Sequence, residues 1–195
     1  MTFWNWRRGL APAATSGSAA LALTGTDLAP IELYTADARI VGWIAANGQR
    51  VTDLLNEQDE LRLWRPHPSP NAEPVEPASA RDAAPATDDQ GEWQSLATEQ
   101  LILAMPPEWR AARQLRLHRK LRRVALSAGP FSVTGNLHLP QNGEPSQDLL
   151  TERHFLPLTD AYILHNGDPA FEHVVSVVIV NTAHVTQLIA LVTLA

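Results

Sequence analysis

Histidine is the side chain in this sequence that could most readily bind a metal ion or transfer a proton at neutral pH. Six of the seven histidines lie between His118 and His184, and acidic residues stand among them at Asp160, Asp168 and Glu172. No two histidines have the HxH, HxxxH or HExxH spacing that brings two metal ligands together on one strand or helix. We therefore predict no metal site.

Nucleophilic catalysis has no better support. The sequence contains no cysteine, and Ser127, Ser132 and Ser176 stand outside any GxSxG element. It contains no glycine-rich phosphate loop of the GxGxxG or P-loop type. We predict that the protein is not an enzyme and that it binds no cofactor.

The densest charge in the chain is positive. Seven basic residues and no acid stand between positions 110 and 123: Arg110, Arg113, Arg116, Arg119, Lys120, Arg122 and Arg123. Prolines at 106 and 107 suit the first turn of a helix, so we predict a connecting helix over residues 106–122. Its basic side chains are expected to form a solvated face. The alternative is that five of the six arginines bind a phosphorylated ligand or nucleic acid, namely Arg110, Arg113, Arg116, Arg119 and Arg123.

Composition narrows the class of protein. At 195 residues and 45% hydrophobic content, the chain can bury a core. Its net charge of −6 gives no overall attraction to nucleic acid, which is therefore not expected as a partner outside the basic cluster. A single lysine, Lys120, against fourteen arginines indicates a GC-rich bacterial genome.

Neither end of the chain resembles a membrane or export segment. Arg7 and Arg8 precede a stretch that is too polar for a secretion signal. The C-terminal stretch 174–195 is interrupted by Asn181 and other polar residues, whereas a spanning helix needs about 20 apolar residues. We predict a cytoplasmic protein without a membrane span, with two strands around a polar turn near its C-terminus.

Aromatic residues stand out near the N-terminus. Residues 1–27 are predicted to form a flexible tail, in which Phe3, Trp4 and Trp6 dock on a surface of the fold or of a partner. Large aromatic side chains often dominate the binding energy of protein interfaces. We predict that these three residues bind a protein partner.

One internal segment differs from the rest. Residues 65–92 are rich in proline and acidic residues and have almost no large apolar side chain. Such a segment cannot bury enough surface to offset the entropy of ordering. We predict a disordered insertion there.

The remaining sequence repeats itself. The matched positions are Ile40 with Val133, Gly42 with Gly135, Ile44 with Leu137, Gly48 with Gly143, DLL at 53–55 with DLL at 148–150, Leu61 with Leu156, Leu63 with Leu158, and Leu101–Leu103 with Val178–Val180. A duplication is the economical explanation, although two β-hairpins can resemble each other by chance.

Each copy predicts the same local structure. A glycine within alternating apolar residues indicates a strongly bent strand, and the DLL segment indicates one helical turn that Thr52 or Asp53 could cap. We predict a mainly β protein of two related small antiparallel β-barrels or rolls joined by one helix. The first covers residues 28–105, interrupted by the insertion, and the second covers residues 123–195.

The repeated pattern resembles a family. The segment Arg50–Asn56, RVTDLLN, and the later stretch Val178–Val185 are similar to an uncharacterised bacterial small-β-barrel domain, which combines a glycine-bent strand, an R-(L/V)-(S/T)-D-L-L-N motif and a closing strand that ends in Asn and His. The matching residues are Gly42, Arg50, Asp53, Asn56, Gly135, Asp148, Asn181 and His184. The resemblance implies a fold and no activity.

The motif is divided between the copies. The first copy has Arg50 and Asn56 but Ala104 where the closing Asn is expected. The second copy has Asn181 but Pro145 and Thr151 in place of the Arg and Asn. Because neither copy is complete, we expect these polar residues to form structural hydrogen bonds. The predicted function is that of a scaffold or interaction subunit.

Overall fold

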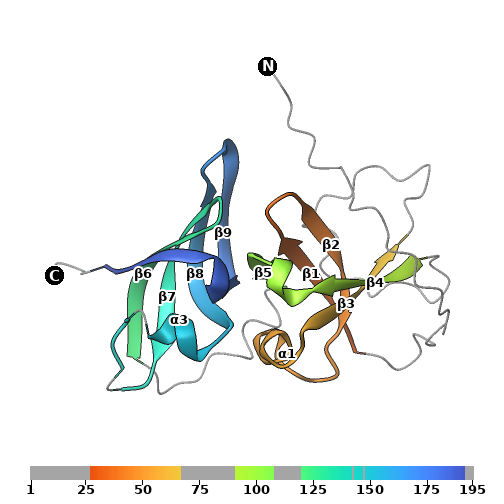
Figure 1. Ribbon diagram of the computed structural model, residues 1–195, viewed down its shortest axis with the longest axis horizontal. Coiled ribbons are helices and arrows are strands. Elements are labelled where there is room, and N and C mark those ends of the chain that lie inside the picture. Colours follow the sequence, from red (N-terminus) through yellow and green to blue (C-terminus); the bar gives the residue numbers. More distant parts are fainter. Residues whose placement is uncertain (1–26, 67–90, 108–119, 142, 147, 192–195) are drawn as a thin grey trace.

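Strands dominate residues 27–66, 91–107, 120–141, 143–146 and 148–191, which are the residues that the computed structural model describes. The first half contains β1 (Leu28–Tyr34), β2 (Arg39–Ala45), α1 (Val51–Glu57), β3 (Glu60–Pro66), β4 (Gly91–Ala97), the 3-10 turn η1 (Thr98–Gln100) and β5 (Leu103–Met105). The second half contains β6 (Lys120–Ala128), β7 (Phe131–Leu139), α3 (Leu149–Glu152), β8 (Phe155–His165), β9 (Asp168–Asn181), the 3-10 turn η3 (Thr182–His184) and β10 (Val185–Ala190). The prediction of a mainly β protein is confirmed (Figure 1).

All ten strands belong to one antiparallel sheet. Their order is β10-β6-β7-β8-β9-β5-β1-β2-β3-β4, so β9 and β5 join the two halves and β10 and β4 are the edges. The two halves stand side by side, with β5 and β9 between them (Figure 1). The prediction of two barrels is wrong, because neither half closes. The edges of β5 and β9 that could have closed the halves pair with each other instead.

The central strands are buried because both halves pack against them. In β7, buried and half-buried residues alternate along the strand, as expected where one face of a sheet covers a core. In β9 the last residues are all buried. Val177 and Ile179 belong to the core of the first half, whereas Val178 and Val180 belong to the core of the second.

The two halves have the same order of elements and the same strand neighbours. Each runs strand, strand, helix, strand, strand, 3-10 turn, strand. In each half the fifth strand pairs with the first, the first with the second, the second with the third and the third with the fourth. We call two residues equivalent when they hold the same place in these two patterns.

The pairing registers also agree. Four opposite pairs in the first half have equivalents in the second. The first-half pairs are Ile31–Gly42, Ile44–Leu63, Glu60–Ala97 and Leu33–Ala104. Their equivalents, in the same order, are Val124–Gly135, Leu137–Leu158, Phe155–Asn181 and Leu126–Leu188. Ala97 is therefore equivalent to Asn181, and Ala104 to Leu188. The predicted match of Ala104 with the closing Asn is wrong.

Gly42 and Gly135 lie where the next strand crosses closely. A Cβ atom at Gly42 would stand 2.7 Å from Cγ of Leu63, and one at Gly135 would stand 2.9 Å from Cβ of Leu158. Leu63 and Leu158 are themselves equivalent. Only glycine fits at either position without a shift of the neighbouring strand.

The start of each 3-10 turn is held in the same way. The amide and the hydroxyl of Thr98 donate to the carbonyl of Asp59, at 2.9 and 3.0 Å. The amide and the hydroxyl of Thr182 donate to the carbonyl of His154, at 2.8 and 3.2 Å. Both hydroxyls thus bond to the chain just before the third strand of their half.

One predicted alignment is wrong. Leu101–Leu103 follow η1, whereas Val178–Val180 precede η3, so these segments are not equivalent. Leu103 instead lies opposite Val180 in the β5–β9 pair. Both segments are apolar because they fill the junction between the halves, and this shared composition produced the false match.

The predicted boundaries also change. Residues 1–26, 67–90 and 108–119 lie outside the described residues, and with them most of the predicted tail, insertion and connecting helix. The described end of the predicted helix is the beginning of β6, at Lys120. The two ends of the predicted insertion, residues 65–92, belong to strands, since Arg65 of β3 pairs with Glu92 of β4, so the predicted bounds are wrong at both ends. The predicted strands around a polar turn are β9 and β10 around η3.

Candidate functional site

Asn181 ties the two halves together at the centre of the sheet. It is the last residue of β9 and is 3% exposed. Its side-chain amide donates to the carbonyls of Leu101 and Thr98 in the first half, at 2.8 and 3.3 Å. Its side-chain oxygen accepts the amide of Ala183 at 3.0 Å. One side chain therefore caps η3 and holds η1.

Two further side chains cross the same junction. The amide group of Asn56, in α1, donates to the carbonyl of Phe155 at 3.1 Å, and its oxygen accepts the amide of Phe155 at 3.0 Å. The ring nitrogen Nε2 of His184 donates to the carbonyl of Glu99 at 2.8 Å. We call Asn56, Asn181 and His184 the junction lock.

The junction lock brings together motif residues from both halves of the sheet. Asn56 comes from the first half, and Asn181 and His184 come from the second. Arg50 is the N-cap residue of α1 and Asp148 that of α3, and neither makes a side-chain capping bond. The prediction that Thr52 or Asp53 caps α1 is wrong, because that helix begins before them, at Val51.

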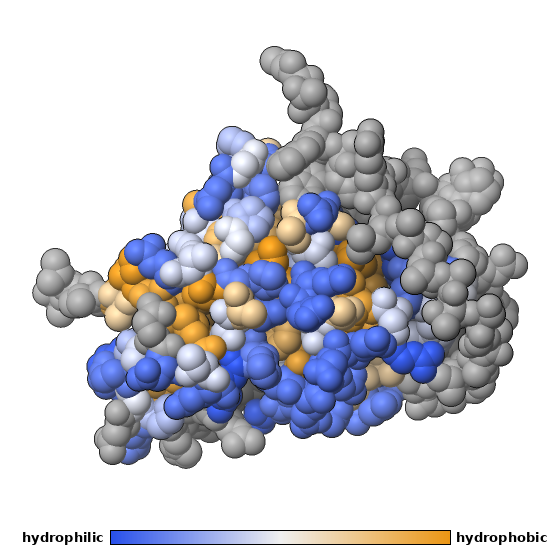
Figure 2. All heavy atoms as spheres, in the orientation of Figure 1, coloured by the Kyte–Doolittle hydropathy of each residue, from blue (hydrophilic) through white to orange (hydrophobic). Residues whose placement is uncertain are grey.

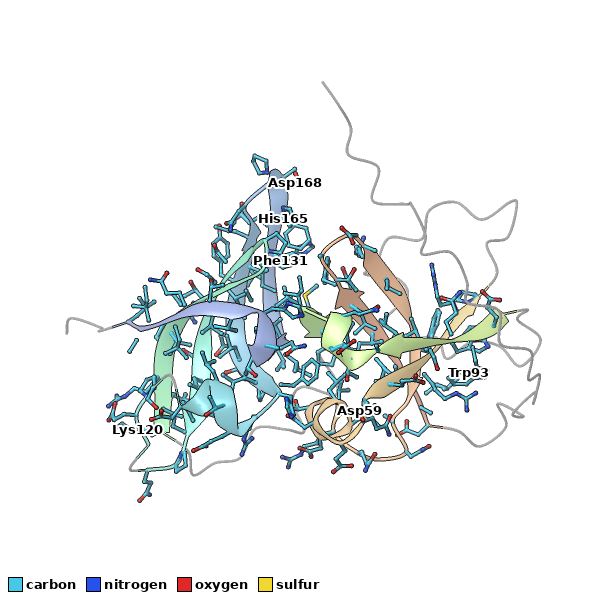
Figure 3. All side chains as sticks on the ribbon, in the orientation of Figure 1. Asp59, Trp93, Lys120, Phe131, His165 and Asp168 are labelled. Atoms are coloured by element: carbon cyan, nitrogen blue, oxygen red, sulfur yellow. The ribbon has the colours of Figure 1, made fainter. Side chains whose placement is uncertain are left out.

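A cavity of about 200 Å³ opens between the two halves. Its lining residues are Tyr34 and Arg39 from the first half and Phe131, Asp168, Phe171 and His173 from the second. Phe131, His165 and Asp168 follow one another toward the hairpin end of β8 and β9, on the side that faces β1 and β2 (Figure 3). We call this cavity and the adjoining edge of β9 the junction cleft.

Aromatic rings form the floor of the junction cleft. The ring of Tyr34 meets those of Phe131 and Phe171 edge to face, at centroid distances of 5.5 and 5.4 Å. The ring of His173 lies 4.4 Å from that of Phe171. Edge-to-face contacts of this kind are favourable. They join the first half to the second through a single aromatic cluster.

Glu32 and Arg39 neutralise each other beside the junction cleft, and Asp168 adds a carboxylate to its lining. The carboxylate of Glu32 accepts hydrogen bonds from the hydroxyl of Tyr34 and the guanidinium of Arg39. Burial, and then the charge of Glu32, raise the pKa of Tyr34 well above its usual range, so its phenol keeps its proton at neutral pH. Burial lowers the pKa of His173, which Arg39 also lowers and Glu32 opposes. The imidazole is therefore favoured in its neutral form.

A long edge of β9 borders the cavity without a strand partner among the described residues. β9 runs from Asp168 to Asn181, but β5 pairs with it only at Ile179 and Val180. Next to these pairs, the backbone amide of Asn181 donates a hydrogen bond to the carbonyl of Ile102. Pro106 and Pro107 follow β5, and proline has no amide hydrogen for a strand ladder. The edge between Asp168 and Val178 is thus open to an added strand.

The predicted binding residues are only partly described. Phe3, Trp4 and Trp6 lie outside the described residues, as do Arg110, Arg113, Arg116 and Arg119. Arg123 lies in β6, where its side chain donates to the carbonyl of Asp160 at 2.8 Å. Lys120 and Arg122 pair with Glu144. The described part of the basic cluster is therefore engaged within the fold.

Among the described residues, no three His, Asp or Glu side chains come together as metal ligands would. No helix found there has the length and apolar character needed to cross a membrane.

Sequence reasoning missed the aromatic cluster. Tyr34, Phe131 and Phe171 stand far apart in the chain, and no spacing connects them. Each stands next to or close to a hairpin turn, at the end of β1, the start of β7 and the start of β9. Their position near hairpin turns was the only signal in the sequence. It would have indicated a cluster only if the three hairpin ends were known to meet.

The chain was also compared with known proteins. No protein-family model, no curated protein and no solved structure matches it.

Proposed function

We propose that the protein is a non-enzymatic interaction subunit of a bacterial, cytoplasmic assembly, and that its junction cleft receives an extended segment of a protein partner. The observation that carries this proposal is the open edge of β9 between Asp168 and Val178. A strand edge offers a row of backbone donors and acceptors, which an extended segment satisfies by adding a strand.

The size and lining of the cavity indicate what the segment carries. Sites for small molecules typically enclose roughly 300–1,000 Å³. The cavity has about 200 Å³, which suits one large side chain. Its walls are aromatic, and the charge of Arg39 is already paired with Glu32. The segment therefore places an apolar or aromatic residue at the cavity.

We further propose that the two halves are diverged copies of one unit, related to the uncharacterised bacterial domain that the sequence resembles. Support comes from the shared order of elements, the shared registers and the equivalent close approach at Gly42 and Gly135. Thr98 and Thr182, which are equivalent, add the same hydrogen bonds in each half.

A display library of random peptides tests the junction cleft. The amide of Asn181 faces the β5 side of β9, and the β8–β9 register is regular from Asn181 to Glu172. Amides at even spacing along a regular strand face the same side, so the amide of Val175 faces the open edge. Val175→Pro removes that donor, and Val175→Ala is the matched control. We expect selected peptides to alternate around an aromatic or apolar residue, and to bind Val175→Pro at least about tenfold more weakly. Equal binding to both variants would place the interaction elsewhere.

The other predicted contacts are proposals for separate experiments. A chain that lacks residues 1–8 should bind a native partner more weakly if Phe3, Trp4 and Trp6 form a second contact. Binding of a phosphorylated ligand or nucleic acid through the basic cluster is the alternative function. No described contact favours it, since Lys120, Arg122 and Arg123 bond within the fold.

A further inference from the structure

The strands at the two edges of the sheet are equivalent to strands that already pair with each other. β4 is equivalent to β9, and β10 is equivalent to β5. At the junction, the fourth strand of one half pairs with the fifth strand of the other. β4 and β10 lie at opposite ends of the strand order. The outer edge of each has no strand partner among the described residues.

We propose that copies of this chain join head to tail, with β10 of one copy pairing with β4 of the next as β5 pairs with β9. The contact joins two different surfaces, so every added copy presents a new open edge. The assembly is a ring if the rotation between copies closes, and a filament if it does not. The contact between β10 and β4 involves neither the junction cleft nor the partner proposed for it.

The junction predicts the register of the contact. Ala104 lies opposite Ile179 there, and their equivalents are Leu188 in β10 and Ser95 in β4. Leu188 of one copy therefore lies opposite Ser95 of the next. Both strands run antiparallel in this arrangement, as β5 and β9 do.

The backbone groups at these two positions point toward the open edges. The amide of Leu191 donates to the carbonyl of Arg123 in β6 at 2.8 Å, and amides two residues apart face the same side. The amide of Leu188, at odd spacing from Leu191, therefore faces outward. The amide of Thr98 donates to the carbonyl of Asp59 before β3, so the amide of Ser95 also faces outward.

The edge at β10 has little protection against pairing, since a register shift lies only at its start, between Val185 and Gln187. Natural edge strands are commonly guarded by charged residues, proline or bulges that turn the edge away. Residues 185–191 contain neither a charge nor a proline, and the strand is regular from Gln187 onward. Ile189 is 45% exposed and Leu191 is 41% exposed. Figure 2 shows hydrophobic residues gathered where this strand runs toward the C-terminus.

The contact between copies is weaker than the junction. Thr151 and Ala97 are equivalent to Asn56 and Asn181, so the two amides of the junction lock are missing at the edges. Gln187 stands at the equivalent of buried Leu103, and Ser95 at that of buried Ile179. A more polar contact without these amides dissociates reversibly, so assembly depends on concentration.

Sedimentation equilibrium of the full chain, from micromolar to millimolar concentration, tests the proposal. We expect the wild type to form species larger than a dimer as concentration rises. Ser95→Pro and Leu188→Pro each block one edge, so each variant alone should remain monomeric. Ser95→Thr and Leu188→Ala keep the amide and should assemble as the wild type does. An equal mixture of the two proline variants should form a dimer and nothing larger, through the one intact edge of each.

Three results would overturn the proposal. The first is a wild type that remains monomeric throughout. The second is a proline variant that still dimerises alone, which indicates pairing between identical edges. The third is a mixture of folded proline variants that stays monomeric. Circular dichroism establishes that each variant is folded.

A gain-of-function variant keeps the proposal testable if proline disrupts the fold. Ala97→Asn with Thr151→Asn places the two amides of the junction lock at the edges. We expect the apparent dissociation constant of self-association to fall about tenfold. An unchanged constant would show that the edges do not meet as β5 and β9 do.

Discussion

The junction and the open edges use equivalent strands but differ in the residues that they present. At the junction, Val177–Val180 of β9 are all buried and apolar, as are Leu101–Met105, which end in β5. At the edges, the equivalent stretches of β4 and β10 include Gln94, Ser95 and Gln187. The hydrogen-bonding lock is also confined to the junction.

This difference shows where the two halves differ most. Positions inside each half, such as Gly42 and Gly135 or Thr98 and Thr182, keep the same residue and the same contacts. The strands that meet at the junction are apolar and carry the amide side chains nearby, whereas the equivalent edge strands include polar residues. If copies join as proposed, equivalent strands would form a tight apolar contact at the junction and a more polar one between copies.

Asn181→Ala should have the largest effect on the comparison. The substitution removes three hydrogen bonds and leaves two buried carbonyls at the junction without their donor. We expect the free energy of unfolding to fall by about 3 kcal/mol. Urea denaturation followed by tryptophan fluorescence measures this loss. A loss close to zero would mean that water satisfies the two carbonyls once the amide is removed, and that the junction does not depend on Asn181.

Gly42→Ala and Gly135→Ala test the close approach of the next strand, which the two halves share. Each added methyl group would lie within 3 Å of a side chain on the next strand, so that strand must shift. We expect both substitutions to lower the free energy of unfolding by about 2 kcal/mol. Chemical denaturation of the two variants side by side measures the costs. A large cost at one glycine and none at the other would break the equivalence of the halves.

Asn56→Ala and Thr151→Ala compare the junction and the edge at equivalent helix positions. Asn56 makes two bonds to the backbone of Phe155, whereas the hydroxyl of Thr151 bonds only to the carbonyl of Asp148 within its own turn. We expect Asn56→Ala to lower the free energy of unfolding by about 1.5 kcal/mol. Thr151→Ala should change it by less than about 0.5 kcal/mol. Thermal denaturation of both variants separates the two outcomes, and equal losses would contradict the comparison.

Much of the fold was predictable because the strands carry local patterns. Alternating apolar residues around Gly42 and Gly135 predicted two similar strands, and the DLL segments predicted short helical turns, which α1 and α3 are. Barrel closure was not predictable, since β5 pairs with β1 in its own half and closure depends on whether its other edge pairs with β4 or with β9. Both pairings suit the same apolar sequence.

The site was harder to predict than the fold. The motif residues Asn56 and Asn181 were identified in the sequence, but each was assigned to its own copy. Their bonds cross from one half to the other, at sequence separations of 99 and 80 residues. Contacts of that kind follow from the β5–β9 pairing, which no local pattern in the sequence contains. The cavity beside Tyr34 depends on the same pairing.

The smallest expected effect concerns the burial of His173 in the junction cleft. Burial lowers the pKa of this side chain in the folded protein, whereas in the unfolded chain it titrates near its ordinary value of about 6.5. As pH falls through that value, the unfolded chain takes up the proton first, so the folded state loses stability. The loss stops below the pKa of the folded state, where both states are protonated.

His173→Phe isolates this effect, because it keeps an aromatic ring beside Phe171 but cannot be protonated. The stability advantage of the wild type over the variant should decrease as pH falls from about 7.5 to about 5, since only the wild type has this titration. Melting temperatures of both proteins across this range measure the difference, and groups common to both, such as Glu32 and Arg39, largely cancel. If the advantage instead grows as pH falls, the charge of Glu32 outweighs burial, and the junction cleft is open to water as the edges are.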